Sequence, residues 1–214
     1  MKFILYYYLS IVLSTVNIFF IANDISSVND LISNKITVNE AEIAMQKFEK
    51  FETFITSLSL FIIIPFFFFI PLWIYRTTNN AKYLGAENMQ FSGGFLSSIL
   101  YFIPILNLFL PFMAMSELYK ISVNLIEWKT IKTDKILKIW WLAWIVNIYL
   151  ILKILVVNAK EETDALVLEY YNLSFVSEIA YIFLAFSFLK IITIITKNQI
   201  VQYDNMTIMV ENER

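Results

Sequence analysis

Five long apolar runs constrain this chain more than any other feature of its sequence. They cover residues 3–22, 54–75, 91–115, 136–157 and 173–196. A helix needs roughly 20 apolar residues to cross a hydrocarbon core about 30 Å thick, and each run reaches that length. Lipid offers no hydrogen bonds to exposed backbone groups, so a spanning segment must satisfy its own. We therefore predict an all-α integral membrane protein with a single membrane domain, residues 1–214.

The composition supports this class and excludes several functions. Apolar residues make up 59% of the chain and charged residues 16%, against about 45–50% and about 25% in soluble domains. The chain has no histidine and no cysteine, which excludes disulfides, thiolate chemistry and zinc sites of the Cys/His kind. A formal net charge of -2 provides no basic stripe for nucleic acid. We expect no metal, no cofactor and no nucleic-acid partner.

The first run has two interpretations. If the run is a signal peptide, Lys2 forms the short basic segment that precedes its apolar part. The run is too long for that, however, and Phe20 and Ala22 form a poor cleavage site, which favours a retained helix.

A polar loop, residues 23–52, separates the first two runs. Asn39 followed by Glu42 has the spacing of a helix cap with its capping-box acid. Apolar residues then recur at helical spacing, so we predict that the second helix begins outside the membrane and continues into it.

The third run, residues 91–115, permits a re-entrant hairpin or a kinked crossing helix. Pro104 and Pro111 each break a helix interior, and Asn107 lies between them. Lys and Arg favour the cytoplasmic side, but either topology places ten of the assigned basic residues on one side and four on the other. We favour the hairpin, giving four transmembrane helices plus a Pro-broken fifth segment, with cytoplasmic termini. A separate amphipathic helix should begin near Phe112, with Glu117 on its polar face.

Three sequence blocks within residues 73–122 carry a resemblance to a known family. The first contains Trp73, Tyr75, Arg76, Asn80, Lys82, Leu84, Gly85 and Ala86. The second contains Phe91, Ser92, Gly93, Gly94 and Phe95. The third contains Phe102, Ile103, Pro104, Asn107, Leu108, Pro111, Ala114, Met115, Glu117 and Leu118. Together they resemble the DUF4328 family of bacterial multi-pass membrane proteins, whose activity is not established.

The resemblance implies a bacterial inner-membrane location and a structural motif. The motif residues are Trp73, Arg76, Asn80, Gly85, Pro104, Asn107, Pro111 and Glu117. This chain departs from the family pattern in having Gly93 in place of proline, Phe95 and Tyr119 in place of tryptophan, and a longer first loop. These departures affect local turn geometry.

Glu178 is the only acidic residue deep in an apolar run, on one helix face with Ser174 and Tyr181. A charged group at mid-membrane costs about 2.5–3.5 kcal/mol, so it normally has a partner or a purpose. It is either a proton- or cation-binding carboxylate or a paired carboxylate near the interface. On the first helix, Ser14 and Asn17 share a face that favours helix packing.

Asn107 and Arg76 are the other candidate ligand-binding residues. Asn107 either lines a substrate site in a broken helix or satisfies carbonyl groups freed by Pro111. Arg76 either forms an ion pair with Glu117, which would hold the motif region closed, or binds a lipid phosphate.

These residues lead to two hypotheses about function. The first is a non-enzymatic membrane scaffold or accessory subunit that packs with other membrane proteins or with itself. The alternative is a small transporter or lipid/ion-binding protein that uses Asn107, Glu178 and the broken third segment. An enzyme fits least, since the chain lacks His, Cys and paired intramembrane acids. The expected partners are membrane lipids and another membrane protein or a second copy of the chain.

Overall fold

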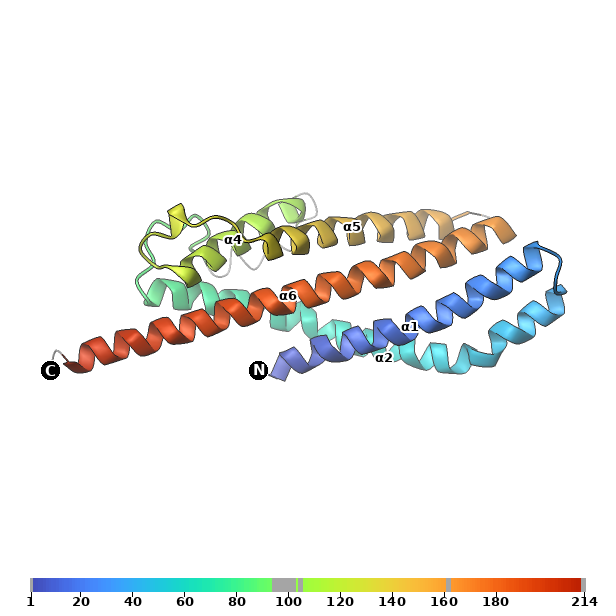
Figure 1. Cartoon of the computed structure of the whole chain (residues 1–214), viewed down its shortest axis with the longest axis horizontal. Helices are drawn as coiled ribbons and strands as arrows, with labels where there is room; N and C mark the ends of the chain where they lie inside the picture. Colours follow the sequence, from blue (N-terminus) through green and yellow to red (C-terminus); the bar gives the residue numbers. More distant parts are fainter. Residues whose placement is uncertain (1, 94–102, 104–105, 161–162, 213–214) are drawn as a thin grey trace. The chain divides into compact units, whose positions relative to one another are not determined.

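The computed structural model describes residues 2–93, 103, 106–160 and 163–212, and every regular element within them is helical (Figure 1). The four long helices are α1 (Lys2–Ile32), α2 (Val38–Tyr83), α5 (Lys135–Asn158) and α6 (Asp164–Asn212). A shorter helix, α4 (Leu110–Val123), lies between two 3-10 turns, η1 (Leu106–Leu108) and η2 (Trp128–Thr130). The predicted all-α class is confirmed.

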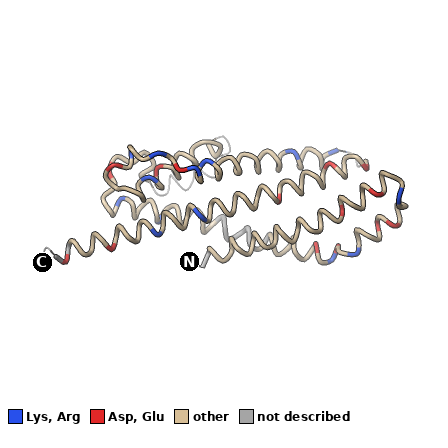
Figure 2. The backbone as a smooth tube through the Cα atoms, viewed as in Figure 1, with Lys and Arg blue, Asp and Glu red and all other residues tan. Residues whose placement is uncertain are grey.

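Among the described residues, three helices are long and apolar enough to cross a membrane. They are Ile4–Ile32, Lys135–Asn158 and Asp164–Met209, and Figure 2 shows long stretches of these helices without charged residues. On α5, Leu142 and Leu155 are each 59% exposed, as expected for side chains that contact lipid. Helix α6 has 49 residues, or about 74 Å at 1.5 Å per residue. It is therefore more than twice as long as a hydrocarbon core of about 30 Å.

The start of α2 differs from the sequence prediction. The Thr37 N–H donates to Glu40 Oε2 (2.8 Å), and the Glu40 N–H donates to Thr37 Oγ1 (3.3 Å). These reciprocal bonds form a capping box, and the bonds from Thr37 lower the pKa of Glu40. The predicted box of Asn39 and Glu42 was wrong, because Thr37 and Glu40 have the same spacing and lie directly at the turn.

Most of the predicted polar loop is helical. Helix α1 continues to Ile32 and α2 begins at Val38, so only the short turn between them is non-helical. The second helix does begin well before its apolar run, as predicted. It also continues through residues 54–75 without interruption.

The chain divides into two compact units. Unit 1 contains Met1–Ile64 and Leu142–Phe186, and unit 2 contains Pro65–Trp141 and Ser187–Arg214. Helices α2, α5 and α6 each contribute to both units, so neither unit is a continuous stretch of chain. The single membrane domain stays a prediction.

In unit 1, α1 and the first part of α2 run side by side from their connecting turn (Figure 1). The Phe20 ring lies 5.6 Å from the Phe48 ring and 5.5 Å from the Phe51 ring, centroid to centroid. Such aromatic pairs contribute packing beyond simple area burial. The buried apolar side chains of this unit include Leu13, Phe20, Val28, Ala41, Ile55, Leu150, Val157 and Ala185.

In unit 2, α4 packs with the first part of α5 and the last part of α6. The largest fully buried side chains are Pro111, Met115, Ile121, Ser122, Leu137, Ser187, Ile191, Ile192 and Ile195. Asp134 begins α5 by accepting the Ile136 N–H at 2.8 Å, and it also accepts the Tyr119 hydroxyl at 3.1 Å. This side chain therefore connects α4 to the start of α5.

Candidate functional site

The loop after α2 begins with a tight turn at Gly85. Its φ of +97° lies in the left-handed region, which glycine adopts without a Cβ penalty. The Gly85 N–H donates to the Lys82 carbonyl (2.9 Å) and the Ala86 N–H donates to the Ala81 carbonyl (3.0 Å). This pair of bonds is a Schellman motif, which satisfies the last carbonyls of the helix. The glycine of the resemblance block therefore has a defined structural role.

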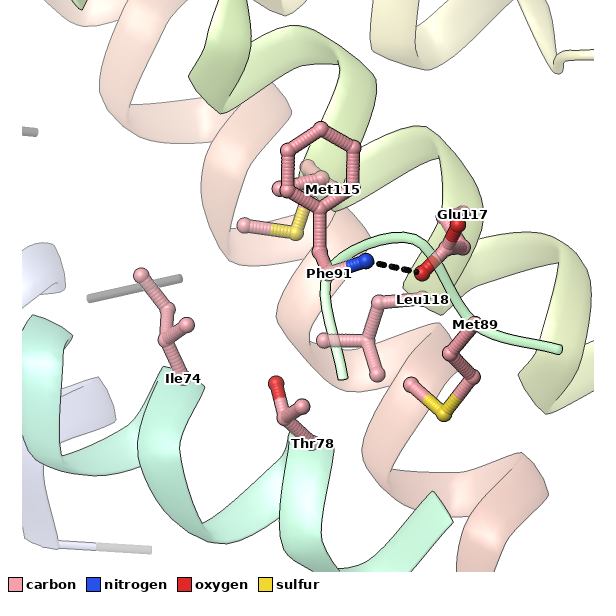
Figure 3. A pocket seen from close by; sticks show the side chains of 8 residues that line it. Ile74, Thr78, Met89, Phe91, Met115, Glu117 and Leu118 are labelled. Carbon is pink, nitrogen blue, oxygen red and sulfur yellow. Dashed lines mark hydrogen bonds between the residues drawn. The ribbon is translucent and has the colours of Figure 1, made fainter. Parts of the chain in front are cut away.

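Glu117 fixes the far end of the same loop. It lies on α4, is 6% exposed, and accepts the N–H of Gln90 (2.9 Å) and the N–H of Phe91 (3.0 Å), one on each carboxylate oxygen. Figure 3 shows the carboxylate facing the loop backbone at Phe91. Hydrogen bonds to a charged acceptor are about twice as strong as neutral ones. Glu117 thus holds the loop against α4.

The space beside this clamp is too small for a ligand. It has a volume of about 10 Å³, which is roughly room for one water molecule. Its lining residues are Ile74, Thr78, Met89, Phe91, Ala114, Met115, Glu117 and Leu118. Glu117 is accordingly a structural residue of unit 2.

The predicted ion pair between Arg76 and Glu117 was wrong. Among the described residues, the only salt bridge joins Lys35 to Asp30, and both Glu117 oxygens accept backbone N–H groups. Two backbone N–H donors satisfy the buried Glu117 carboxylate, so the guanidinium of Arg76 does not have to be desolvated to pair with it. Arg76 is exposed on α2, and no hydrogen bond of its side chain is formed with the described part of the chain.

Arg76 instead lines an open groove between the end of α2 and the later part of α6, within unit 2. The groove has a volume of about 580 Å³. Its lining residues are Trp73, Arg76, Thr77, Asn80, Tyr83, Leu84, Thr196, Gln199, Ile200 and Tyr203. They recur at helical spacing on both helices, and Arg76 is their one charged member. The groove is therefore cationic and rich in aromatic and amide groups.

Two side-chain hydrogen bonds hold the walls of this groove together. The Trp73 indole N–H donates to Thr196 Oγ1 (3.2 Å), and Gln199 Nε2 donates to the Thr77 carbonyl (2.9 Å). Trp73 and Asn80, two motif residues, line the same groove as Arg76. Because these bonds fix the two helices locally, the groove is a defined surface rather than a gap between loose side chains.

The broken third segment matches the prediction in part. Pro104 lies outside the described residues, Asn107 lies in η1, and Pro111 occupies the first turn of α4, where its missing N–H is harmless. A separate helix near Phe112 is therefore confirmed. Its expected polar face was wrong, because Glu117 is buried against the loop.

The buried Oδ1 of Asn107 has no hydrogen-bond partner in the described part of the chain, and the predicted role of its amide, to satisfy a freed carbonyl, stays a prediction. The Leu108 carbonyl accepts the Trp141 indole N–H at 2.8 Å, and the Trp141 ring packs on Phe112 at 5.4 Å between centroids. Trp141 was not predicted to have this role, because the sequence does not show which carbonyl of the proline-broken turn its indole N–H reaches.

Glu178 lies in unit 1, where α1 supplies its partners. Its Oε2 accepts the Ser14 hydroxyl, and its Oε1 accepts Asn17 Nδ2 at 3.1 Å. The face of α1 expected to favour packing therefore contacts Glu178 directly. These bonds satisfy both oxygens, as expected for the paired carboxylate rather than for an open ion site.

Comparison with known proteins identifies one family. A family model described as "Domain of unknown function (DUF4328)" matches residues 35–197. No curated protein and no solved structure matches the chain.

Proposed function

Because this chain belongs to the DUF4328 family, whose function is unknown, we propose a function from its own side chains: it is a non-enzymatic membrane protein that holds the phosphate of an anionic phospholipid beside Arg76. The observation that carries the proposal is an exposed arginine that forms no ion pair within the described part of the chain and lines a groove of about 580 Å³. This volume lies in the range of small-molecule sites, roughly 300–1,000 Å³.

The chemistry of the groove fits a lipid headgroup. Arginine presents a planar fork of donors that matches phosphate oxygens. Asn80 and Tyr203 add donors for glycerol and ester oxygens, and none of the lining residues is acidic. Trp73 and Tyr83 are residues that favour the membrane–water boundary. Arg76 directly follows the apolar run of α2, so a phosphate at headgroup depth would lie beside it.

The proposal includes a topology for the chain. We propose that α2 crosses the membrane together with the three spanning candidates, and that both termini are cytoplasmic. Cysteines introduced at Asn39 and Asn205 should then react with an impermeant label from opposite faces of the membrane. Labelling of both positions from one face would support five crossings instead.

Lipid retention tests the headgroup site directly. The protein is purified in mild detergent, exchanged into vesicles or micelles containing phosphatidylglycerol, and examined by native mass spectrometry. Arg76→Ala should retain that lipid about 10–100-fold less well, because a hydrogen bond to a charged group contributes about 1.5–3 kcal/mol. Lys82→Ala is the matched control, since Lys82 is an exposed cation on the same helix outside the groove.

The alternatives predict different results. If inorganic phosphate displaces the lipid signal at millimolar concentration, the site binds free phosphate rather than a headgroup. Equal lipid retention by Arg76→Ala and Lys82→Ala would refute the site. A membrane protein that co-purifies with both variants, in the absence of bound lipid, would favour the scaffold or accessory-subunit role.

A further inference from the structure

The loop that joins α4 to α5, residues 124–134 (yellow in Figure 1), carries one large apolar side chain on its outside. Ile126 is 91% exposed, more than any other large apolar side chain of the described residues. Val123, at the end of α4, is a further apolar residue with 46% exposure. Single exposed apolar residues are ordinary on protein surfaces, so the surroundings of Ile126 decide whether it has a function.

Hydrogen bonds fix the loop in this conformation. The side-chain oxygen of Asn124 accepts the N–H groups of Ile126 and Glu127, each at 3.0 Å. The Trp128 ring is 8% exposed, and its indole N–H donates to the Glu87 carbonyl (3.2 Å). The backbone on both sides of Ile126 is therefore held in place. Its side chain can turn inward only if these bonds break.

Lysines follow this exposed isoleucine at every third position. They are Lys129, Lys132, Lys135 and Lys138. All four are exposed, and none forms an ion pair within the described part of the chain. Figure 2 shows Lys and Arg (blue) recurring along the loop and the start of α5. Two acids, Glu127 and Asp134, lie in the same stretch, and Asp134 already accepts the Tyr119 hydroxyl. The loop is therefore cationic as well as apolar at its surface.

The loop leads directly into a helix that is long and apolar enough to cross a membrane. Helix α5 begins at Lys135 and is one of the three candidate spans. Ile139, in its second turn, is 50% exposed, as expected where lipid contacts the helix. When α5 crosses, the preceding loop lies at the level of the lipid headgroups. Lysine suits this level, because its apolar stem can lie along the acyl chains while its charge reaches the phosphates.

We propose that residues 124–138 dock on an anionic membrane surface, with Ile126 inserted at the boundary between headgroups and acyl chains. Basic residues beside a spanning helix are attracted to anionic headgroups, and an apolar side chain supplies the part that inserts. A protein partner fits this surface less well, because the centres of protein interfaces are depleted in lysine. The docking does not depend on the groove at Arg76, because the two surfaces share no residue.

A fluorescent label at Ile126 tests the proposal in the full-length protein. The chain has no cysteine, so Ile126→Cys gives a single attachment point for an environment-sensitive dye. The protein is reconstituted into vesicles of phosphatidylcholine alone, or of equal parts phosphatidylcholine and phosphatidylglycerol. In the anionic vesicles the dye emission should move to shorter wavelength, and spin-labelled lipid should quench it. Asn205→Cys, an exposed position in the same unit, is the matched control and should stay in water in both.

Removing one lysine should weaken the docking. Lys132→Ala in the labelled protein should lower the ratio of inserted to water-exposed dye about fivefold, the usual contribution of one lysine near an anionic surface. Lys132 is chosen because Lys129 also lies over the Trp128 ring, 5.5 Å from its centroid. Salt at about 1 M should likewise release the dye, because it screens surface charges. Arg76→Ala should leave the dye signal unchanged, which separates this docking from the headgroup site.

Three results would overturn the proposal. The first is identical dye emission in the two kinds of vesicle. The second is an unchanged ratio in Lys132→Ala, which would remove the role of charge. The third is a shift to shorter wavelength that grows with protein concentration in detergent without anionic lipid. That result would assign the loop to contact between copies of the chain.

Discussion

Replacing Glu117 with alanine should release the loop after α2 from α4. The buried carboxylate accepts the N–H groups of Gln90 and Phe91 at 2.9 and 3.0 Å. In the Ala variant both donors lose this acceptor. Water can reach the exposed Gln90 but reaches the half-buried Phe91 less easily. The Phe91 amide should therefore account for more of the loss.

The expected loss of stability is about 3 kcal/mol. Each hydrogen bond to a charged acceptor contributes about 1.5–3 kcal/mol, and solvent access at Gln90 reduces the first of these. For a protein of this size, about 1 kcal/mol moves the unfolding midpoint by about 2–4 °C. The Ala variant should therefore unfold about 6–12 °C below the wild type. Glu117→Gln keeps one acceptor oxygen and should lose roughly half as much.

Thermal unfolding in detergent measures this shift, and limited trypsin digestion reports on the loop itself. Lys82 lies just before the Schellman turn, so cleavage after it should accelerate in Glu117→Ala. Glu87→Ala is the matched control, because Glu87 is an exposed acid in the same loop. Its structural contact is a backbone one, from the Trp128 indole N–H to the Glu87 carbonyl (3.2 Å).

Equal midpoints for Glu117→Ala and Glu87→Ala would show that the clamp is not a stabilising contact. The same series tests the absence of an ion pair to Arg76. Without that pair, the effects of Arg76→Ala and Glu117→Ala should add to within about 0.5 kcal/mol. If the double variant loses clearly less stability than the sum of the two single variants, Arg76 and Glu117 do form an ion pair.

Three further predictions concern other contacts. Asn17→Ala should lower the unfolding midpoint, because it leaves one Glu178 oxygen without its donor and so costs about 1–3 kcal/mol of stability. Adding Glu178→Leu should recover part of this loss. Trp141→Phe keeps the ring but removes an indole donor, so it should cost about 1 kcal/mol by the same measurement; no change would contradict the role of that bond. Burial and the nearby Asp134 raise the pKa of Tyr119 above its usual value of 10.0. The neutral phenol is therefore favoured in the folded state, and stability should fall as the pH rises above about 10. Tyr119→Phe should show less of this alkaline loss in pH-dependent unfolding.

The sequence predicted the helices and several of their ends. Apolar runs of membrane length specify helices wherever they occur, because the backbone can satisfy itself only locally in lipid. Gly85 marked the turn after α2, since its φ of +97° is readily adopted only by glycine. The predicted cap of α2, Asn39, lies two residues after the observed cap, Thr37. The error arose because Thr37 and Glu40 have the same capping-box spacing as Asn39 and Glu42.

The partners of the polar side chains were harder to predict. Arg76 and Glu117 have opposite charges and suggested a pair, but backbone amides took the carboxylate instead. The pattern of charged residues in a sequence does not show which backbone amides a loop places beside a carboxylate. The burial of Asp24, which is 5% exposed, was not predicted for a related reason: residues 23–52 were predicted to be a polar loop and are largely helical.

The sequence by itself determined that this chain forms long apolar helices interrupted near Pro111, because helix formation and proline breaks depend on neighbouring residues. It also marked Ser14 and Asn17 as one face of α1 and Glu178 as an inward residue of α6. Only the tertiary structure decided that these two faces meet, joining residues more than 160 positions apart. Hydrogen bonds between helices depend on the rotation and register of each helix, and these are set by packing of the whole unit rather than by any local pattern.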